Sequence, residues 1–261
     1  MNEHRIFFTA CFLFLTLLLL SIFSPSAFCK QKYTTDDFSA DDYYLAGVID
    51  EARSQYELAI KEYNQALALD SKLVDAYVSR GRCYGKLKNY KKAIADLARA
   101  IKMKPDSYNA YIERGNIYHA MRSYEHAIAD FTKAIDIDPE SSKAYTLRGY
   151  SHYFEGHFNL AIADEDKAIE LNPKDNKAYQ YRGYVYNKKG EYNQAVDDET
   201  AAINLVPYAG SAYAYKARAE AYYELARYDE AWDDVHKFQS FGIIADRDFL
   251  EKLKTDSGRE K

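Results

Sequence analysis

The sequence is poor in the residues that interrupt helices. It contains 5 Pro and 11 Gly among 261 residues, a content that fits helices better than a turn-rich β fold. It is also poor in cysteine, because only Cys83 follows Cys29. The chain beyond Cys29 therefore cannot form an internal disulfide, and we expect Cys83 to be a small buried residue rather than a reactive thiol. The net charge of -5, without a clustered basic face, argues against a nucleic-acid-binding protein.

The sequence also lacks the motifs that mark common active sites. There is no glycine-rich phosphate loop, no HExxH, no pair of closely spaced cysteines and no GxSxG. Among the 6 histidines, His152 and His157 are close in sequence, but their spacing of five residues across a helix end does not suit zinc. We therefore expect no enzymatic activity, no cofactor and no metal, and we interpret His152 as a core residue.

One long apolar run lies near the N-terminus. Residues 6–23 read "IFFTACFLFLTLLLLSIF" without a charge, and "SPSAFCK" follows. A polar start, an apolar segment and small residues are typical of a signal peptide, with cleavage before Lys30. At about 1.5 Å per residue the run also reaches roughly 27 Å, enough for an uncleaved membrane anchor. "SAFC" is also similar to a lipoprotein box ending at Cys29, although Phe28 is large for its position.

All three interpretations of residues 1–29 place the remaining chain across a membrane. We expect it to be periplasmic or secreted, or held at the membrane by residues 6–23. Membrane contact is expected only through this segment. Residues 30–39, "KQKYTTDDFS", are predicted to form a polar linker.

The rest of the chain repeats itself every 34 residues. Tyrosine, glycine, alanine and proline recur together at this period, four times each. The recurring residues are Tyr77, Tyr111, Tyr145 and Tyr179; Gly81, Gly115, Gly149 and Gly183; Ala93, Ala127, Ala161 and Ala195; and Pro105, Pro139, Pro173 and Pro207. When each unit is numbered from 1 to 34, the apolar and small positions 4, 8 and 11 share one helix face, and positions 20, 24 and 27 share another. Each unit is therefore predicted to be an antiparallel helix pair, closed by the proline.

The repeat divides the chain into six units and a cap. The predicted units are 40–73, 74–107, 108–141, 142–175, 176–209 and 212–245. The first is degenerate, and the last is displaced by two residues because "YAGS" after Pro207 is predicted to lengthen the turn. Residues 246–261 are predicted to form a capping helix and tail, in which Phe249, Leu250 and Leu253 share one face.

This order of Tyr, Gly, Tyr, Ala, aromatic, Ala and Pro at a period of 34 resembles the tetratricopeptide repeat. The resemblance covers roughly residues 40–245. It implies an all-α, right-handed superhelical solenoid of about six helix-turn-helix repeats, in which the first helices line a concave groove. It further implies a protein or peptide partner.

One departure from the family pattern is an arginine at position 7, where an aliphatic residue is common. Every unit with this arginine also has an aspartate at position 23, whereas the first unit has Ala46 and Glu62. The pairs are Arg80 with Asp96, Arg114 with Asp130, Arg148 with Asp164, Arg182 with Asp198, and Arg218 with Asp234. We predict structural ion pairs between helices rather than a row of anion-binding sites, because a partly buried guanidinium requires a partner.

Position 24 is unusual in two units, where Glu165 and Glu199 occupy a slot that is aromatic in Phe131. We expect each carboxylate to pair with a neighbouring arginine or with His152. Catalysis would require a second poised group in the same pocket, and the sequence does not place one.

The resemblance implies that positions 2, 5, 9, 12 and 13 of the first helices line the concave groove, and the remaining functional signal lies there. The candidate partner-binding residues are Asn116, His119, Tyr150, Tyr153, Phe154, Gln180, Tyr184, Asn187, Lys188, Lys216 and Tyr223. An exposed group of aromatic side chains suggests recognition. We predict a non-catalytic scaffold that binds a peptide or protein segment in this groove. The alternatives are a self-associating structural or assembly protein of the cell envelope and, more distantly, an enzyme.

Overall fold

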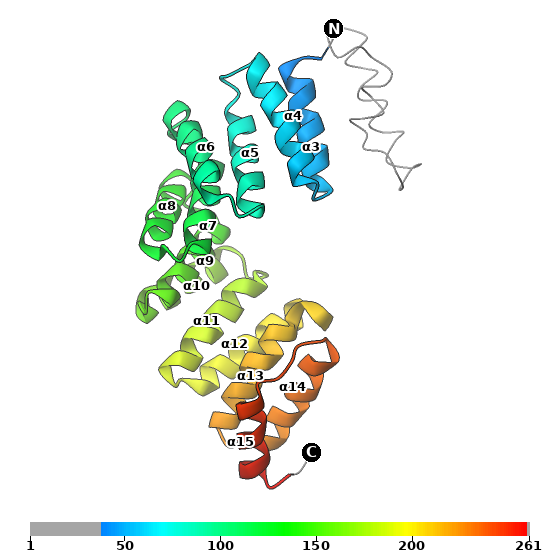
Figure 1. Cartoon of the computed structure of the whole chain (residues 1–261). Coiled ribbons are helices and arrows are strands. Elements are labelled where there is room, and N and C mark those ends of the chain that lie inside the picture. The colour runs from blue at the N-terminus through cyan, green and yellow to red at the C-terminus, as the bar shows by residue number, and fades with distance from the viewer. Residues whose placement is uncertain (1–37, 260–261) are drawn as a thin grey trace. The chain divides into compact units, whose positions relative to one another are not determined.

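A computed structural model describes residues 38–259 as an all-helical fold without strands (Figure 1). The predicted leader, most of the predicted linker and residues 260–261 lie outside the described residues. The helices are α3 (Ala40–Ala52), α4 (Tyr56–Leu69), α5 (Val74–Lys86), α6 (Tyr90–Met103), α7 (Tyr108–Ala120), α8 (Tyr124–Ile137), α9 (Ser142–Phe154), α10 (Phe158–Leu171), α11 (Asn176–Lys189), α12 (Tyr192–Leu205), α13 (Ala212–Glu224), α14 (Tyr228–Ser240) and α15 (Arg247–Ser257). Within residues 38–259, no helix is both long enough and apolar enough to cross a bilayer.

The turn inside each helix pair has the same backbone conformation. Residue 15 of every unit has a positive φ, between 56° and 78°. Glycine provides this conformation in only two units. The residues are Ser54, Lys88, Arg122, Gly156, Gly190 and Ala226. Four units therefore tolerate a left-handed non-glycine residue, which costs about 1 kcal/mol or more, so that a short turn can join the two helices.

The connection after Pro207, which the sequence predicts to be a lengthened turn, is a short 3-10 helix. Residues Tyr208–Ser211 form a single 3-10 turn, η2, before α13 begins. The Ser211 hydroxyl is buried and donates to the carbonyl of Tyr208 at 2.9 Å. The two-residue displacement of the last repeat thus comes from a hydrogen-bonded turn.

Glycine at position 8 of the first helix faces the side chain at position 24 of the second helix. A Cβ added to Gly115 would lie 2.6 Å from the ring of Phe131, and one added to Gly47 would lie 2.5 Å from the ring of Tyr63. Both rings are completely buried. The glycine is thus required because an aromatic ring occupies the space that its side chain would fill.

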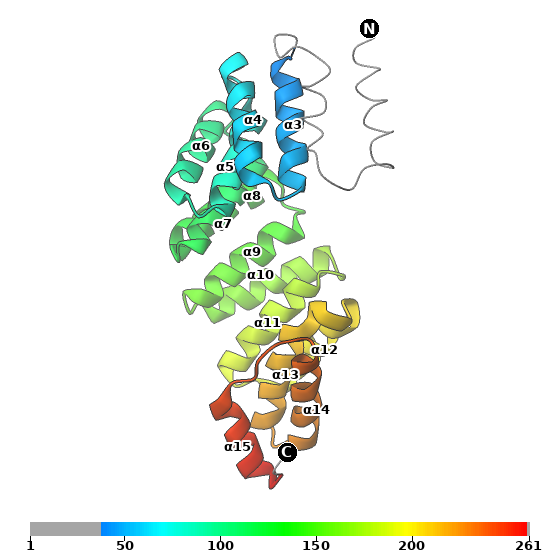
Figure 2. The ribbon, with the colours of Figure 1, turned by 45° about the vertical axis from the view of Figure 1, so that its right-hand side comes forward.

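The chain divides into two compact units, one ending at Asp96 and the other beginning at Leu97. In the first unit, α3 packs on α4, and α4 on α5. In the second unit, the first helices of successive repeats also contact one another, α7 with α9, α9 with α11 and α11 with α13 (Figure 2). These helices therefore form a continuous inner layer, and residues that point away from the second helices face a common side of this unit.

Helix α15 closes the C-terminal end of the second unit. Leu253 is completely buried, and Phe249 and Leu250 pack against the same cluster as Trp232, Val235 and Phe238. Asp246 is the N-cap residue just before the helix, and its side chain accepts from the backbone N–H of Phe249 at 3.0 Å. The apolar face of α15 covers the end of the last repeat, which would otherwise be exposed.

Each of the five arginine–aspartate pairs is a bidentate ion pair between the two helices of one repeat. The Nε and Nη2 atoms of each arginine donate to the two carboxylate oxygens at 2.7–2.9 Å. The aspartates are buried, and the arginines also lie 5.4–5.7 Å from the ring of the tyrosine at position 4. A planar guanidinium suits both contacts, which lysine could not reproduce.

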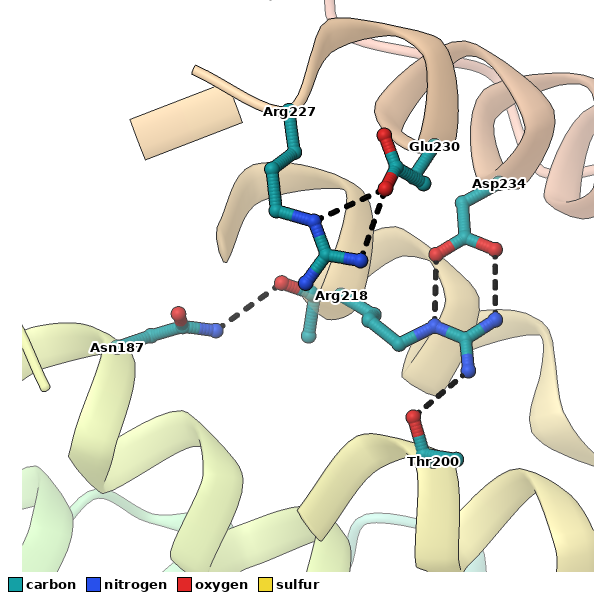
Figure 3. Close-up of polar contacts among 7 residues, drawn as sticks. Asn187, Thr200, Arg218, Arg227, Glu230 and Asp234 are labelled. Carbon is teal, nitrogen blue, oxygen red and sulfur yellow. Dashed lines mark hydrogen bonds and ion pairs between the residues drawn. The ribbon is translucent and has the colours of Figure 1, made fainter. Parts of the chain in front are cut away.

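In four of the five repeats the same arginine also reaches the preceding repeat. Its Nη1 donates to the side chain of position 25 of that repeat, as Arg218 does to Thr200 at 2.8 Å (Figure 3). The partners are Asn64, Thr132, Asp166 and Thr200. Arg114 differs because Ala98 stands at the corresponding place. These arginines therefore fix the register between neighbouring repeats as well as within one, and their donors are used by the fold.

Candidate functional site

The inner layer of the second unit contains an open cavity of about 370 Å³. Helices α9, α11 and α13 contribute most of its wall, and α12 contributes one residue. The lining residues are Tyr153, Tyr184, Asn187, Lys188, Tyr192, Tyr213, Lys216, Ala217, Glu220 and Glu224. We call this cavity the tyrosine pocket, because four of its ten lining residues are tyrosines.

Helical spacing brings these residues to one side. On α11, Tyr184, Asn187 and Lys188 are three or four residues apart, and on α13, Lys216, Glu220 and Glu224 are separated by four. Tyr213, at the start of α13, is 62% exposed and leaves an accessible ring at the edge of the pocket. The pocket thus combines aromatic faces with charged side chains of both signs.

Asn187 joins two of these helices at the base of the pocket. Its Nδ2 donates to the main-chain carbonyl of Ala217 at 3.1 Å, which ties α11 to α13 (Figure 3). This hydrogen bond fixes the orientation of the amide and uses its Nδ2. Oδ1 is buried and has no hydrogen-bond partner among the described residues. A buried acceptor without a donor costs stability.

The carboxylates of the pocket are only weakly neutralised by its lysines. Lys216 Nζ lies 4.0 Å from Glu220 Oε1, on side chains that are 38% and 50% exposed. Burial raises the pKa of Glu220 above its usual value, while Lys216 and Lys188 act in the opposite direction. An ion pair at this distance and exposure contributes little and is easily replaced.

Beside the pocket, aromatic rings stack on one another across three repeats. Tyr150 lies between His119 and Tyr181, with ring centroids 5.0 Å and 3.9 Å away and nearly parallel planes. Phe154 stacks on Tyr124 at 5.0 Å, yet remains 45% exposed. Burial lowers the pKa of His119, and its Nδ1 is hydrogen-bonded to the Ser151 hydroxyl at 3.0 Å, which itself donates to the carbonyl of Leu147 at 2.9 Å. These rings stabilise the contact between repeats and leave Phe154 as the accessible member.

The structure places the predicted concave residues in four settings. Tyr153, Tyr184, Asn187, Lys188 and Lys216 line the tyrosine pocket. His119, Tyr150 and Phe154 belong to the neighbouring stack. Asn116 and Gln180 are half-buried on α7 and α11, outside the pocket lining.

Tyr223 occupies a setting of its own, against the cap. Its hydroxyl donates to Asp256 at 2.6 Å, and its ring packs edge-on against Phe249 of α15. The hydrogen bond to the carboxylate raises the pKa of Tyr223 to about 12. Tyr223 therefore packs against the capping helix rather than facing the groove. The repeat pattern could not predict this contact, because α15 lies outside the repeats.

Sequence reasoning missed five pocket residues, and three of them carried a usable signal. Tyr213, Glu220 and Glu224 fall at positions 2, 9 and 13 of the last repeat, which are groove positions. Ala217 accepts a hydrogen bond from Asn187 through its main-chain carbonyl, and its methyl side chain gives no indication of this role. Tyr192 comes from the start of α12, and the repeat pattern assigns that place to the helix break rather than to the groove.

The expectation that Glu165 and Glu199 pair with an arginine or with His152 is wrong. Both side chains are completely buried, and their carboxyl oxygens have no hydrogen-bond partner within residues 38–259. They face glycine instead, since a Cβ at Gly149 or Gly183 would lie 2.6 Å or 2.7 Å from the nearest carboxyl oxygen. The neighbouring arginines are already held by aspartates. Burial, with a smaller effect of Asp164 and Asp198 respectively, raises the pKa of both glutamates well above the usual value.

The histidines and acids of the described chain do not converge on a metal site. Within residues 38–259, no three His, Cys, Asp or Glu side chains are arranged to hold an ion. His152 Nε2 lies 3.9 Å from Asp164 Oδ2, and its ring is 5.7 Å from that of His157. Burial lowers the pKa of His152. Cys83 is completely buried.

Family profiles match most of the repeat array. Profiles described as "Tetratricopeptide repeat" match residues 74–107, 108–141, 142–175 and 166–197, and one described as "TPR repeat" matches residues 47–88. Together the matches run without a gap from residue 47 to residue 197, more than half of the 261 residues. None of the curated proteins matches the chain in sequence.

Solved structures with low sequence identity share the fold. A tetratricopeptide repeat protein from Parabacteroides merdae ATCC 43184 is 20% identical with a TM-score of 0.66, over 88% of both chains. MamA from Desulfovibrio magneticus RS-1 is 19% identical with a TM-score of 0.58, over 64% of this chain and 94% of that one. YrrB, described as a TPR protein with an unusual peptide-binding site, is 20% identical with a TM-score of 0.53, over 69% of this chain and 92% of that one. These likenesses confirm the predicted all-α fold of stacked helix pairs.

Proposed function

We propose that this chain, a member of the tetratricopeptide repeat family, is a non-catalytic scaffold that binds a peptide or protein segment along the inner layer of its second unit. The observation that carries the proposal is the tyrosine pocket on α9, α11 and α13. It offers aromatic surface and side chains of both charges. Aromatic rings and a few fixed polar atoms are the usual means by which a groove recognises an extended chain.

Two further observations support this function. The description of YrrB places a peptide-binding site on a protein of this fold. The five arginines, whose charge could suggest anion binding, are held by their own aspartates and, in four of the five repeats, by the preceding repeat, so that the pocket is the more accessible polar feature. We also propose that residues 1–29 direct the array across a membrane or hold it there.

A pull-down with full-length chain tests the proposal. Tyr213→Ala/Phe154→Ala removes two rings that are 62% and 45% exposed, so the fold should be retained while partner capture falls about tenfold or more. The matched control is Leu160→Ala/Tyr208→Ala, which removes side chains that are 54% and 76% exposed and lie outside the pocket lining. We expect the control to recover the same partners as the wild type.

Equal partner recovery by the Tyr213→Ala/Phe154→Ala variant and the wild type would contradict groove binding. Light scattering on the same preparations separates self-association from capture of another protein. A stable dimer that dissociates in the Tyr213→Ala/Phe154→Ala variant would identify the partner as a second copy of this chain.

A further inference from the structure

The overall acidity of the chain conceals one strongly basic repeat. Residues 74–107 contain nine Lys and Arg against three Asp, a net charge of +6, whereas the remaining 227 residues have a net charge of -11. The expectation of a chain without a clustered basic face therefore does not hold for this repeat. A local excess of positive charge attracts anionic partners even where the whole chain is acidic.

Four of these cations surround the turn that joins α5 to α6 in the first unit (Figure 1). The sequence of residues 86–92 is KLKNYKK, and all four lysines are exposed. Within the described part of the chain, none of their ammonium groups forms an ion pair with an acidic side chain. Lys92 Nζ lies 5.3 Å from the ring centroid of Tyr84 on α5, and Glu51 on neighbouring α3 is paired with Arg82 instead. The four charges are therefore available to an external partner.

The fold itself does not favour lysine at this place. The first turn of α6 contains Lys91 and Lys92 and no acidic residue. The N-terminus of a helix carries a partial positive charge, which disfavours cations there. The second helices of the other repeats have no lysine or arginine in their first turn, and α4, α8 and α14 have an acidic residue instead. This departure from a local rule in one repeat indicates a role in recognition rather than in folding.

An apolar side chain stands at the centre of the same turn. Leu87 lies between Lys86 and Lys88 in sequence and is 38% exposed. A basic turn with an exposed leucine fits an anionic membrane surface, because the lysines meet the headgroups while the leucine enters the apolar boundary beneath them. A nucleic acid or an acidic protein segment would satisfy the lysines and leave Leu87 against charged groups.

The length of chain before α3 brings the turn within reach of a membrane. Sixteen residues separate the end of the apolar run at Phe23 from Ala40, and a chain of this length spans at most about 55 Å. Helix α5 runs alongside α3, so the turn that follows α5 lies about one helix length, roughly 20 Å, from the start of α3. Insertion of residues 6–23 into a bilayer thus leaves the turn free to touch the same membrane.

From these observations we propose that residues 86–92, which we call the lysine turn, form a second membrane contact that binds anionic phospholipid headgroups while Leu87 inserts between them. This inference goes beyond the tyrosine pocket and rests on the proposed placement of the array at a membrane. It extends the expectation that only residues 6–23 touch the membrane. The contact would orient the first unit at the lipid surface.

The test places the full-length chain in nanodiscs and reports on position 87 with a tryptophan. Leu87→Trp adds an indole to the single native Trp232, whose signal is subtracted by means of the wild type. The discs contain brominated phosphatidylcholine alone or in equal parts with phosphatidylglycerol, and bromine quenches an indole that enters the bilayer. We expect quenching at position 87 to be about twofold stronger or more in the anionic discs, and to fall as salt is added.

The matched probe is Met121→Trp. Met121 is the equivalent residue of the next repeat and is 46% exposed, but the helix that follows it begins with Glu125 in its first turn and no lysine. Quenching at position 121 should be the same in neutral and anionic discs. Equal quenching at positions 87 and 121 would contradict a contact made by the lysine turn.

Lysine variants in the Leu87→Trp background test the role of charge. Each lysine near an anionic surface contributes about fivefold to binding, so Lys88→Gln/Lys91→Gln should lower the population of the bound turn about tenfold or more. Both side chains are exposed, and loss of a cation from the first turn of α6 should leave the melting temperature unchanged or raise it. Lys133→Gln/Lys167→Gln removes two lysines that are 61% and 38% exposed outside the lysine turn, and should preserve the quenching.

The inference is overturned if position 87 is quenched equally in neutral and anionic discs, or if Lys88→Gln/Lys91→Gln behaves as the parent. Its failure can be told apart from failure of membrane placement. If the full-length chain co-elutes with neutral discs but position 87 stays unquenched in anionic ones, residues 6–23 hold the array and only the lysine turn is wrong. Absence of the chain from both kinds of disc would overturn both. An unquenched position 87 together with loss of a protein partner by Lys88→Gln/Lys91→Gln would assign the turn to an acidic protein segment instead of lipid.

Discussion

Arg148→Ala is expected to lower the free energy of unfolding of the second unit by about 2–4 kcal/mol. The substitution leaves the carboxylate of Asp164, a side chain only 9% exposed, without the two donors that hold it, and removes the bond to Thr132 in the preceding repeat. Each kcal/mol lowers the melting temperature of a domain of this size by about 2–4 °C, so thermal denaturation followed by circular dichroism will detect the loss.

Two control variants distinguish the loss of a buried ion pair from the loss of a surface charge. Arg247→Ala removes a surface arginine whose side chain is 89% exposed, and its effect should stay within about 1 kcal/mol. Arg148→Met/Asp164→Leu removes both partners and should be less damaging than Arg148→Ala, because no buried carboxylate is left unpaired. An unchanged melting temperature in Arg148→Ala, or loss of partner binding by the fully folded variant, would contradict a purely structural role.

Glu165→Gln/Glu199→Gln is expected to remove most of the loss of stability that the second unit suffers as pH rises. In the folded chain the pKa of both carboxyl groups is raised well above 4.5, because burial disfavours the charged form. The unfolded chain releases these protons near pH 4.5, whereas the folded chain retains them. Their contribution is therefore complete below pH 4.5 and is lost as pH rises toward and through the raised pKa, at up to about 1.4 kcal/mol per pH unit for each group.

Urea denaturation from pH 5 to pH 9 measures this slope. Other titrating groups face the two glutamates, namely Asp164, Asp166, Asp175 and Arg182 around Glu165, and Asp198, Arg218 and Glu220 around Glu199. They are present in both proteins, so the difference between wild type and variant isolates the two glutamates. The variant should come closest to the wild type near pH 5 and exceed it increasingly as pH rises from there. Parallel curves over the whole range would show that both carboxyl groups are already ionised, or solvated, in the fold.

The sequence predicts the repeat well because each helix pair follows from a local pattern. Glycine at position 8 and a large side chain at position 24 are enough to predict close packing of two helices, and Gly115 against Phe131 shows this contact. Arginine at position 7 and aspartate at position 23 occur together in five units, and this predicts that they form ion pairs, because a partly buried guanidinium needs an acceptor nearby. Arg114 and Asp130 show such a pair.

Contacts between repeats are harder to predict, because they depend on how far each side chain reaches. Two hydrogen bonds cross a repeat boundary, from Arg218 to Thr200 and from Asn187 to the carbonyl of Ala217. Neither can be predicted from the residue spacing within one repeat. The buried glutamates were misassigned for a related reason. The sequence predicts that Glu165 pairs with a cation, but its carboxyl group lies against Gly149. The nearby Arg182 is already bound to Asp198.

The groove was predictable as a face but not as a pocket. Positions 2, 9 and 13 of the last repeat carry Tyr213, Glu220 and Glu224, whereas several of the predicted aromatic residues stack on one another around Tyr150. Which aromatic rings remain accessible depends on stacking between repeats, and this is visible only in three dimensions.

Photo-crosslinking from inside the pocket is the most direct test of the tyrosine pocket as the binding surface. A benzophenone amino acid replaces Tyr213 in the full-length chain, and the same probe replaces Tyr208, which is 76% exposed but outside the pocket lining. On irradiation in cells, position 213 should give a discrete crosslinked protein partner and position 208 should give none above background. Equal crosslinking at both positions, or a discrete partner at position 208 alone, would contradict binding in the pocket.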